Sequence, residues 1–84
     1  MLNITPICKR FGKLPAHFKD GYEDKKLFGY EEQGRVMHTT IDESLIPEFL
    51  LWLSNGAKGY KPLRQMLPTE GIEKTLEFAR RYKK

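Results

Sequence analysis

The 84-residue chain has one cysteine, two histidines and no long apolar run. A single cysteine excludes an internal disulfide, so we expect a reducing, cytoplasmic setting. Without an apolar stretch of about 18 residues, no transmembrane helix is predicted. The first residues lack a basic stretch ahead of an apolar one and are not expected to be a secretory signal. His17 and His38 stand alone, so neither a metal nor any other cofactor is expected.

Catalytic patterns are also missing. The chain has no glycine-rich loop of the kind that cradles phosphates. Its paired acids, Glu31-Glu32 and Asp42-Glu43, are adjacent in sequence, and adjacent side chains point apart on a helix or a strand. General acid–base catalysis needs groups that converge on one cleft. We therefore do not expect the protein to be an enzyme. Because 39% of the residues are apolar and 31% are charged, we expect one folded domain over residues 1–84.

Charge is distributed unevenly along the chain, which carries a net charge of +4. Residues 1–30 hold six Lys or Arg against three acids, and residues 56–84 hold eight against three. The middle, residues 31–55, holds one Arg against five acids. Two basic arms thus flank an acidic centre, and a basic surface favours polyanions such as nucleic acid.

The opening residues predict a short helix that ends at Gly12. Thr5 followed by Pro6 is typical of an N-cap and a first helical turn. Apolar side chains then recur at i, i+3, i+4 and i+7 and form one face. These residues are Ile4, Ile7, Cys8 and Phe11. Cys8 is therefore expected to pack in the core rather than to react.

A second short helix is predicted over residues 16–20. Gly21 is expected to end it in the left-handed conformation. Phe18 would face the core, while His17 and Lys19 would face solvent. Two short helices joined by a glycine turn, with basic residues at the joint, are the ingredients of a helix-turn-helix.

The middle of the chain changes to strand periodicity. Two runs rich in aromatic and β-branched residues, 27–30 and 35–41, flank a polar stretch that ends in glycine. This pattern predicts a β-hairpin with its tip at residues 31–34. An acidic tip, formed by Glu31 and Glu32, would repel phosphate.

A mostly apolar helix is predicted next, capped by Asp42 or Ser44 and with Pro47 tolerated in its first turn. Its apolar side chains cover most of its circumference, which predicts that it forms the centre of the core. They are Leu45, Ile46, Phe49, Leu50, Trp52 and Leu53. Trp52 is accordingly expected in the core rather than in an exposed partner-binding stripe.

The last third of the chain predicts a loop and a final helix. Residues 57–68 are interrupted by glycine and proline and read as loop, with one turn at 63–67. Thr69 is expected to cap an amphipathic helix. Its inward stripe would comprise Ile72, Thr75, Leu76 and Ala79, extended by Tyr82.

Seven basic residues lie in and around the two-helix unit, and an eighth stands beside the hairpin tip. We predict that these side chains contact DNA, with His17 and Lys19 near base edges and the others on phosphates. The predicted DNA-binding residues are Lys9, Arg10, Lys13, His17, Lys19, Lys25, Lys26 and Arg35. An ordinary solvated surface would explain the same charges, and helix polarity alone explains the basic C-terminus.

Short segments within residues 3–53 resemble those of one known family and occur in the same order. They are Asn3-Ile4-Thr5, Cys8-Lys9-Arg10-Phe11-Gly12-Lys13, Leu14-Pro15-Ala16-His17-Phe18, Gly34-Arg35-Val36-Met37-His38 and Pro47-Glu48-Phe49-Leu50-Leu51-Trp52. Together they resemble the KilA-N domain of phage and large DNA-virus proteins. Val36 and Thr39 stand where that family has tryptophan and proline, and the spacing into the later helix is shorter. The resemblance implies a DNA-binding domain related to winged helices, often found in phage regulatory proteins.

These observations predict a small α+β domain of winged-helix type. Its order would be two short N-terminal helices, a β-hairpin, a hydrophobic core helix and an amphipathic C-terminal helix. The predicted function is DNA binding in a regulatory, phage-like context, with the last helix as the candidate homodimer surface. The alternative is a small protein-binding inhibitor or adaptor, whose acidic middle or basic ends contact a partner protein and no nucleic acid.

Overall fold

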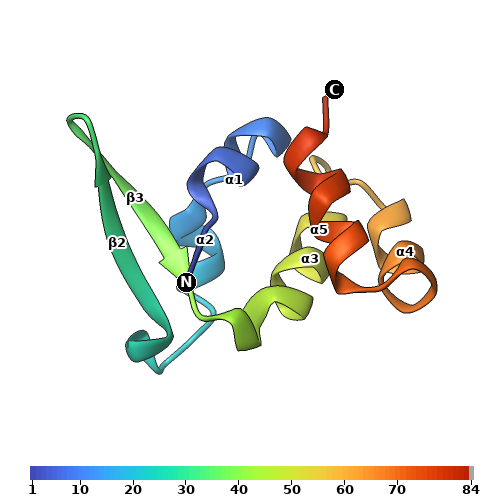
Figure 1. The fold of residues 1–84 in the computed structure, drawn as a ribbon, viewed down its shortest axis with the longest axis horizontal. Helices are drawn as coiled ribbons and strands as arrows, with labels where there is room; N and C mark the ends of the chain where they lie inside the picture. The colour runs from blue at the N-terminus through green and yellow to red at the C-terminus, as the bar shows by residue number, and fades with distance from the viewer. Residues whose placement is uncertain (84) are drawn as a thin grey trace.

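Five α-helices and a three-stranded antiparallel sheet form an α+β fold in the computed structural model, which describes residues 1–83 (Figure 1). The strands are β1 (Leu2–Asn3), β2 (Phe28–Gln33) and β3 (Val36–Ile41). The helices are α1 (Thr5–Phe11), α2 (Pro15–Lys19), α3 (Ile46–Ser54), α4 (Pro62–Glu70) and α5 (Ile72–Arg81), with 3-10 turns η1 (Lys25–Leu27) and η2 (Glu43–Leu45). The β2–β3 hairpin stands at one side, α4 and α5 lie at the other, and α1, α2 and α3 lie between them.

The sheet has the strand order β1-β3-β2, so the hairpin gains a short third strand from the N-terminus. Leu2 pairs with Ile41, and Asn3 pairs with Thr40. Sequence periodicity did not predict β1, because two residues are too short to show any period. This pairing fixes the start of α1 against the base of the hairpin.

The first helix begins at Thr5, the residue predicted as its N-cap, so it starts one residue earlier than predicted. Thr5 is already helical, and Ile4 occupies the N-cap position without a side-chain cap. The Thr5 hydroxyl instead accepts a hydrogen bond from the Thr39 backbone N–H at 2.8 Å, while Asn3 accepts from the Thr5 N–H at 3.1 Å. The prediction of Thr5 as N-cap was therefore wrong, because its hydroxyl bonds to β3. The predicted apolar face, Ile4, Ile7, Cys8 and Phe11, is confirmed as buried.

The second helix ends without the predicted glycine cap. Gly12 has a left-handed conformation (φ 69°) and ends α1 as predicted, but Gly21 does not have positive φ. The end of α2 is held instead by Lys25, whose ammonium donates to the carbonyls of Lys19 at 3.0 Å and Tyr22 at 2.6 Å. The backbone N–H groups of Gly21 and Tyr22 also donate to the carbonyls of Phe18 and Lys19, so the end of α2 is satisfied without a left-handed residue at Gly21. Phe18 is buried as predicted.

The hairpin turn lies further along than predicted. Glu31 and Glu32 pair with His38 and Met37 inside the ladder, and the two-residue connection is Gly34-Arg35. Gly34 has φ 66° and no other turn residue has positive φ, the pattern of a type II′ turn. The acidic tip predicted from sequence was therefore wrong, since Glu31 and Glu32 are strand residues.

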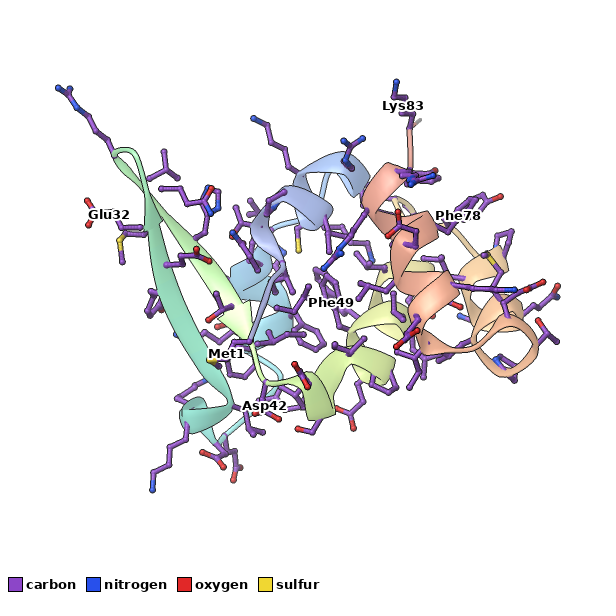
Figure 2. All side chains as sticks on the ribbon, in the orientation of Figure 1. Met1, Glu32, Asp42, Phe49, Phe78 and Lys83 are labelled. Carbon is purple, nitrogen blue, oxygen red and sulfur yellow. The ribbon has the colours of Figure 1, made fainter. Side chains whose placement is uncertain are left out.

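Helix α3 forms the centre of the core, as its composition predicts. Phe49, Leu50 and Leu53 are fully buried, and Figure 2 shows Phe49 in the middle of the molecule.

Asp42 caps η2 rather than α3: its carboxylate accepts from the Ser44 N–H and hydroxyl, and these bonds lower the pKa of Asp42. Among residues 1–83, no helix is long and apolar enough to span a membrane.

A nine-residue helix, α4, replaces the second half of the segment predicted as loop over 57–68 and continues to Glu70, with Pro62 in its first turn and Pro68 inside it. The nearby glycines and prolines favour a loop, but the burial of Leu63 in the core stabilises the helix. Thr69 was wrongly predicted as a cap: its hydroxyl donates to the Gln65 carbonyl at 2.8 Å within α4. Helix α5 instead follows Gly71, which has φ 88°.

The predicted inward stripe of α5 is only partly confirmed. Thr75 and Ala79 are fully buried, but Ile72 is 44% exposed at the first position of the helix. Beyond the helix, the Tyr82 ring stacks on Phe11 with centroids 4.3 Å apart, and Arg10 donates to the Tyr82 carbonyl at 3.4 Å. The end of the described chain is thereby fastened to α1.

Replacement of Tyr82 with alanine should lower the free energy of unfolding by about 2 kcal/mol, because it removes a half-buried ring and its stacking on Phe11. Urea unfolding followed by circular dichroism measures this change. Met37→Ala is the control, since that side chain on β3 is 58% exposed and its loss should cost well under 1 kcal/mol. Equal losses in the two variants would show that Tyr82 does not hold the two helices together.

Candidate functional site

The joint between α1 and α2 is a three-residue turn, Gly12-Lys13-Leu14, held in place by an aromatic anchor on α2. The Phe18 ring packs on Phe49 and Trp52 with centroid distances of 5.3 Å to each, and on Phe28 at 6.0 Å. One side chain therefore fixes α2 against both the hairpin and α3. The outer side of α2, with Ala16 and His17, is left exposed.

Lys13, one of the predicted DNA-binding residues, reaches across to the end of α3. Its ammonium donates to the carbonyls of Trp52 at 2.6 Å and Asn55 at 2.7 Å, and lies 4.5 Å from the centre of the Trp52 ring. Burial lowers the pKa of Lys13. The Trp52 carbonyl also accepts from the Asn55 backbone N–H, so Lys13 adds a second donor there and a first donor at the Asn55 carbonyl. The Lys13 side chain uses two of the three donors of an ammonium group.

Three further predicted residues also make contacts within the protein. Lys19 donates to the Tyr30 hydroxyl and lies 4.4 Å from the centre of that ring, so it joins α2 to β2. Lys25 closes the end of α2, and Arg10 donates to Tyr82. These cations help to hold neighbouring elements together.

The other four predicted residues, Lys9, His17, Lys26 and Arg35, are exposed, and their side chains make no hydrogen bond to residues 1–83. They lie on α1, α2, η1 and the hairpin turn, respectively. The structure therefore does not gather the eight predicted residues into one cluster. It does bring Lys13 and His17 to the same hollow.

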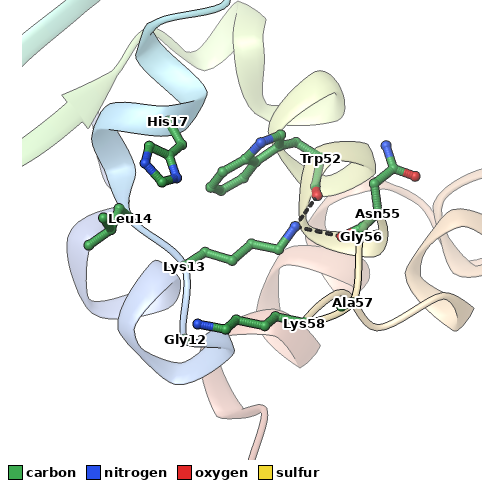
Figure 3. A pocket seen from close by; sticks show the side chains of 9 residues that line it. All are labelled: Gly12, Lys13, Leu14, His17, Trp52, Asn55, Gly56, Ala57 and Lys58. Carbon is green, nitrogen blue, oxygen red and sulfur yellow. Dashed lines mark hydrogen bonds between the residues drawn. The ribbon is translucent and has the colours of Figure 1, made fainter.

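This hollow lies between the α1–α2 turn and the loop after α3, and has a volume of about 440 Å³ (Figure 3). Its lining residues are Gly12, Lys13, Leu14, His17, Trp52, Asn55, Gly56, Ala57 and Lys58. The lining contains two lysines and a histidine but no carboxylate. We call this site the basic hollow.

Sequence reasoning missed Lys58 as a member of the site. It lies 45 positions after Lys13, in the segment predicted as loop, and no local pattern connects the two. The only available signal was the excess of basic residues in the C-terminal arm. Trp52, predicted as core, is half-buried and forms part of the floor of the hollow.

A second hollow, of about 420 Å³, shares His17, Trp52 and Asn55 with the first. It differs in charge, because Glu48 lines it. The Tyr22 hydroxyl donates to Glu48, and burial together with this bond raises the pKa of Tyr22 to about 12. Of these two hollows, the basic hollow is therefore the one that offers an anion a lining without a carboxylate.

Cys8 is buried, and His38 is hydrogen-bonded within the protein. Cys8 is fully buried, as predicted, and burial raises the pKa of its thiol to about 12. His38 Nδ1 is bonded to the Asn3 amide at 2.8 Å. No group of three His, Cys, Asp or Glu side chains within residues 1–83 is placed to hold a metal ion.

Comparison with known proteins gives no relative for this chain: no family model matches it, and neither a curated protein nor a solved structure shows a significant match.

Lys13→Met should lower the free energy of unfolding by about 1–2 kcal/mol, since it removes two charge-assisted hydrogen bonds at the end of α3. Urea unfolding, followed by the fluorescence of the single tryptophan, measures the change. Lys9→Met removes an exposed charge without such bonds and should leave the midpoint nearly unchanged. Identical midpoints in both variants would contradict the capping role of Lys13.

Cys8 should resist thiol reagents in the folded protein. Raising its pKa from 9.0 to about 12 lowers the thiolate fraction at pH 8 about a thousandfold, and burial also excludes the reagent. Labelling with a disulfide reagent at pH 8 should therefore be very slow in buffer and rapid in guanidinium chloride. Comparable rates in both solutions would contradict the burial of Cys8.

Proposed function

We propose that this protein binds duplex DNA as a regulatory protein, with α1, Gly12 and α2 acting as a helix-turn-helix and the β2–β3 hairpin as a wing. The observation that carries the proposal is the basic hollow, which places two lysines and a histidine, without a carboxylate, beside the start of α2. In a helix-turn-helix, the first residues of the second helix contact base edges. Phosphates therefore lie close to that end of the helix.

The side chains at the start of α2 suit this role. Leu14 is 59% exposed, and Ala16 and His17 are also exposed, so this end of the helix is open to a groove. The buried Phe18 holds the helix from behind. Asp20 lies at the opposite end, away from the residues expected to contact bases.

The hairpin also suits a wing better than its sequence suggests. Its turn is Gly34-Arg35, so a cation rather than an acidic pair stands at the tip. Arg35 is exposed. Glu32, which Figure 2 shows near the far end of the hairpin, belongs to β2. A phosphate or minor-groove contact at the tip would therefore involve Arg35 first.

The resemblance of residues 3–53 to the KilA-N domain points to the same class of function. It remains a likeness of short segments, and Val36 and Thr39 depart from the family pattern. A homodimer through α5 would raise the affinity of so small a module. Ile72 and Phe78 on α5 are 44% and 38% exposed and could contribute apolar contacts there.

A second candidate function is protein binding along the outer side of α3. Leu51 is 40% exposed and, with Trp52 and Glu48, lines the second hollow. An adaptor using this surface would bind its partner without any dependence on DNA.

A salt titration of DNA binding tests the proposal. Fluorescence anisotropy with a mixed-sequence duplex should give an affinity that falls steeply with salt, because phosphate contacts release counterions. Lys9→Gln and Arg35→Gln should each reduce the slope of log K against log salt by about 0.9. Lys74→Gln, an equal charge change on α5 at a residue paired with Glu70, is the control and should leave the slope unchanged. Absence of binding at low salt would exclude DNA binding and favour the adaptor.

A further inference from the structure

The basic hollow has the chemistry of an anion site. Two of the three donors of the Lys13 ammonium are used by the carbonyls of Trp52 and Asn55, which leaves one donor. Lys58 is exposed, and its ammonium makes no hydrogen bond to residues 1–83. His17 adds a ring nitrogen that can donate. No carboxylate within the lining competes for these donors.

The close-up view shows how these groups are arranged. In Figure 3, the side chains of Lys13 and Lys58 run past each other in opposite directions, and Lys58 extends toward Gly12. The His17 ring lies beside the Trp52 ring above them. The donors thus come from three parts of the chain: the α1–α2 turn, α2 and the loop after α3.

The loop that carries Lys58 is tightly held. Gly59 lies against the backbone of Ser54 and Asn55, where a Cβ would overlap the Asn55 carbonyl. The Gly59 N–H donates to the Gly56 carbonyl at 3.1 Å, and the Tyr60 N–H donates to the Leu53 carbonyl at 3.1 Å. The root of the Lys58 side chain is therefore fixed beside the hollow, which reduces the ordering cost of ligand binding.

We propose that the basic hollow is a phosphate-binding subsite, in which the exposed Lys58 side chain turns toward Lys13 and His17 and the three side chains together hold one phosphate group. Its role in DNA binding rests on the proposed function: it would hold a backbone phosphate next to the start of α2. The site then contacts DNA through the loop after α3, a part of the chain outside the helix-turn-helix. Inorganic phosphate presents the same kind of oxygen atoms as a DNA backbone phosphate, so it is the simplest probe of the site.

Partial burial of Lys13 supports this assignment. Burial disfavours the charged ammonium and lowers its pKa, because two carbonyls and an aromatic ring replace only part of its hydration. An anion in the hollow would restore favourable charge interactions for this group. Phosphate binding should therefore stabilise the folded protein, as any ligand specific for the folded state does.

The experiment compares Lys58→Gln with the matched control Lys61→Gln in the full chain. Both remove one exposed cation from the same loop region, but only Lys58 lines the hollow. Inorganic phosphate, titrated into ¹⁵N-labelled protein, should shift the amide signals of Gly56 and Lys58 and the Trp52 indole signal. Lys58→Gln should weaken this binding at least about fivefold, while Lys61→Gln should change it less than about twofold. Circular dichroism establishes that both variants fold.

Duplex DNA in the same variants separates this inference from the proposed function. Lys58→Gln should reduce the salt slope of DNA binding by about 0.9 and Lys61→Gln should not. If phosphate binds in the hollow but DNA does not bind, the DNA-binding function is excluded and the phosphate subsite stands. If DNA binds but the two variants behave alike with phosphate and with DNA, the subsite is excluded and DNA binding stands. His17→Gln, from a different element, should weaken phosphate binding as Lys58→Gln does.

Discussion

The placement of α2 between the hairpin and α3 depends on the aromatic ring of Phe18. Helix α2 has only five residues, and an isolated helix of that length is not stable in water. The Phe18 ring contacts Phe28 of β2 together with Phe49 and Trp52 of α3, so one side chain joins three elements. The exposed side of α2, and with it any surface that α2 presents, is set by this aromatic packing.

Helix ends also explain why three of the basic side chains, Arg10, Lys13 and Lys25, donate to backbone carbonyls. Each helix end leaves carbonyls that need donors, and a chain of 84 residues with five helices has many such ends. Lys13 serves the end of α3 and Lys25 serves the end of α2, while Lys19 lies on the Tyr30 ring. The count of cations in the sequence therefore overstates how many are free to contact a ligand. Position, rather than net charge, decides what each one does.

Sequence patterns correctly predicted the features that depend on residues close together in the sequence. The apolar face of α1 and the burial of Phe18 follow from helical spacing. Helix α4 was missed because the glycines and prolines in and before it favour a loop. The helix depends instead on the burial of Leu63, which packing against distant residues produces. Lys58 was missed for the same reason, since its place beside Lys13 depends on contact between two turns far apart in the sequence.

The basic hollow lies between those two turns, and each turn follows the end of a helix. Gly12 ends α1 with φ 69°, and Gly56 follows α3 with φ 81°; both line the hollow. Lys13 lies between the turns because it caps α3, so one residue both stabilises the fold and forms a wall of the hollow. Replacing Lys13 would therefore change stability and ligand binding together. Lys58 has no such structural bond to residues 1–83, so its replacement isolates the contribution of charge to binding.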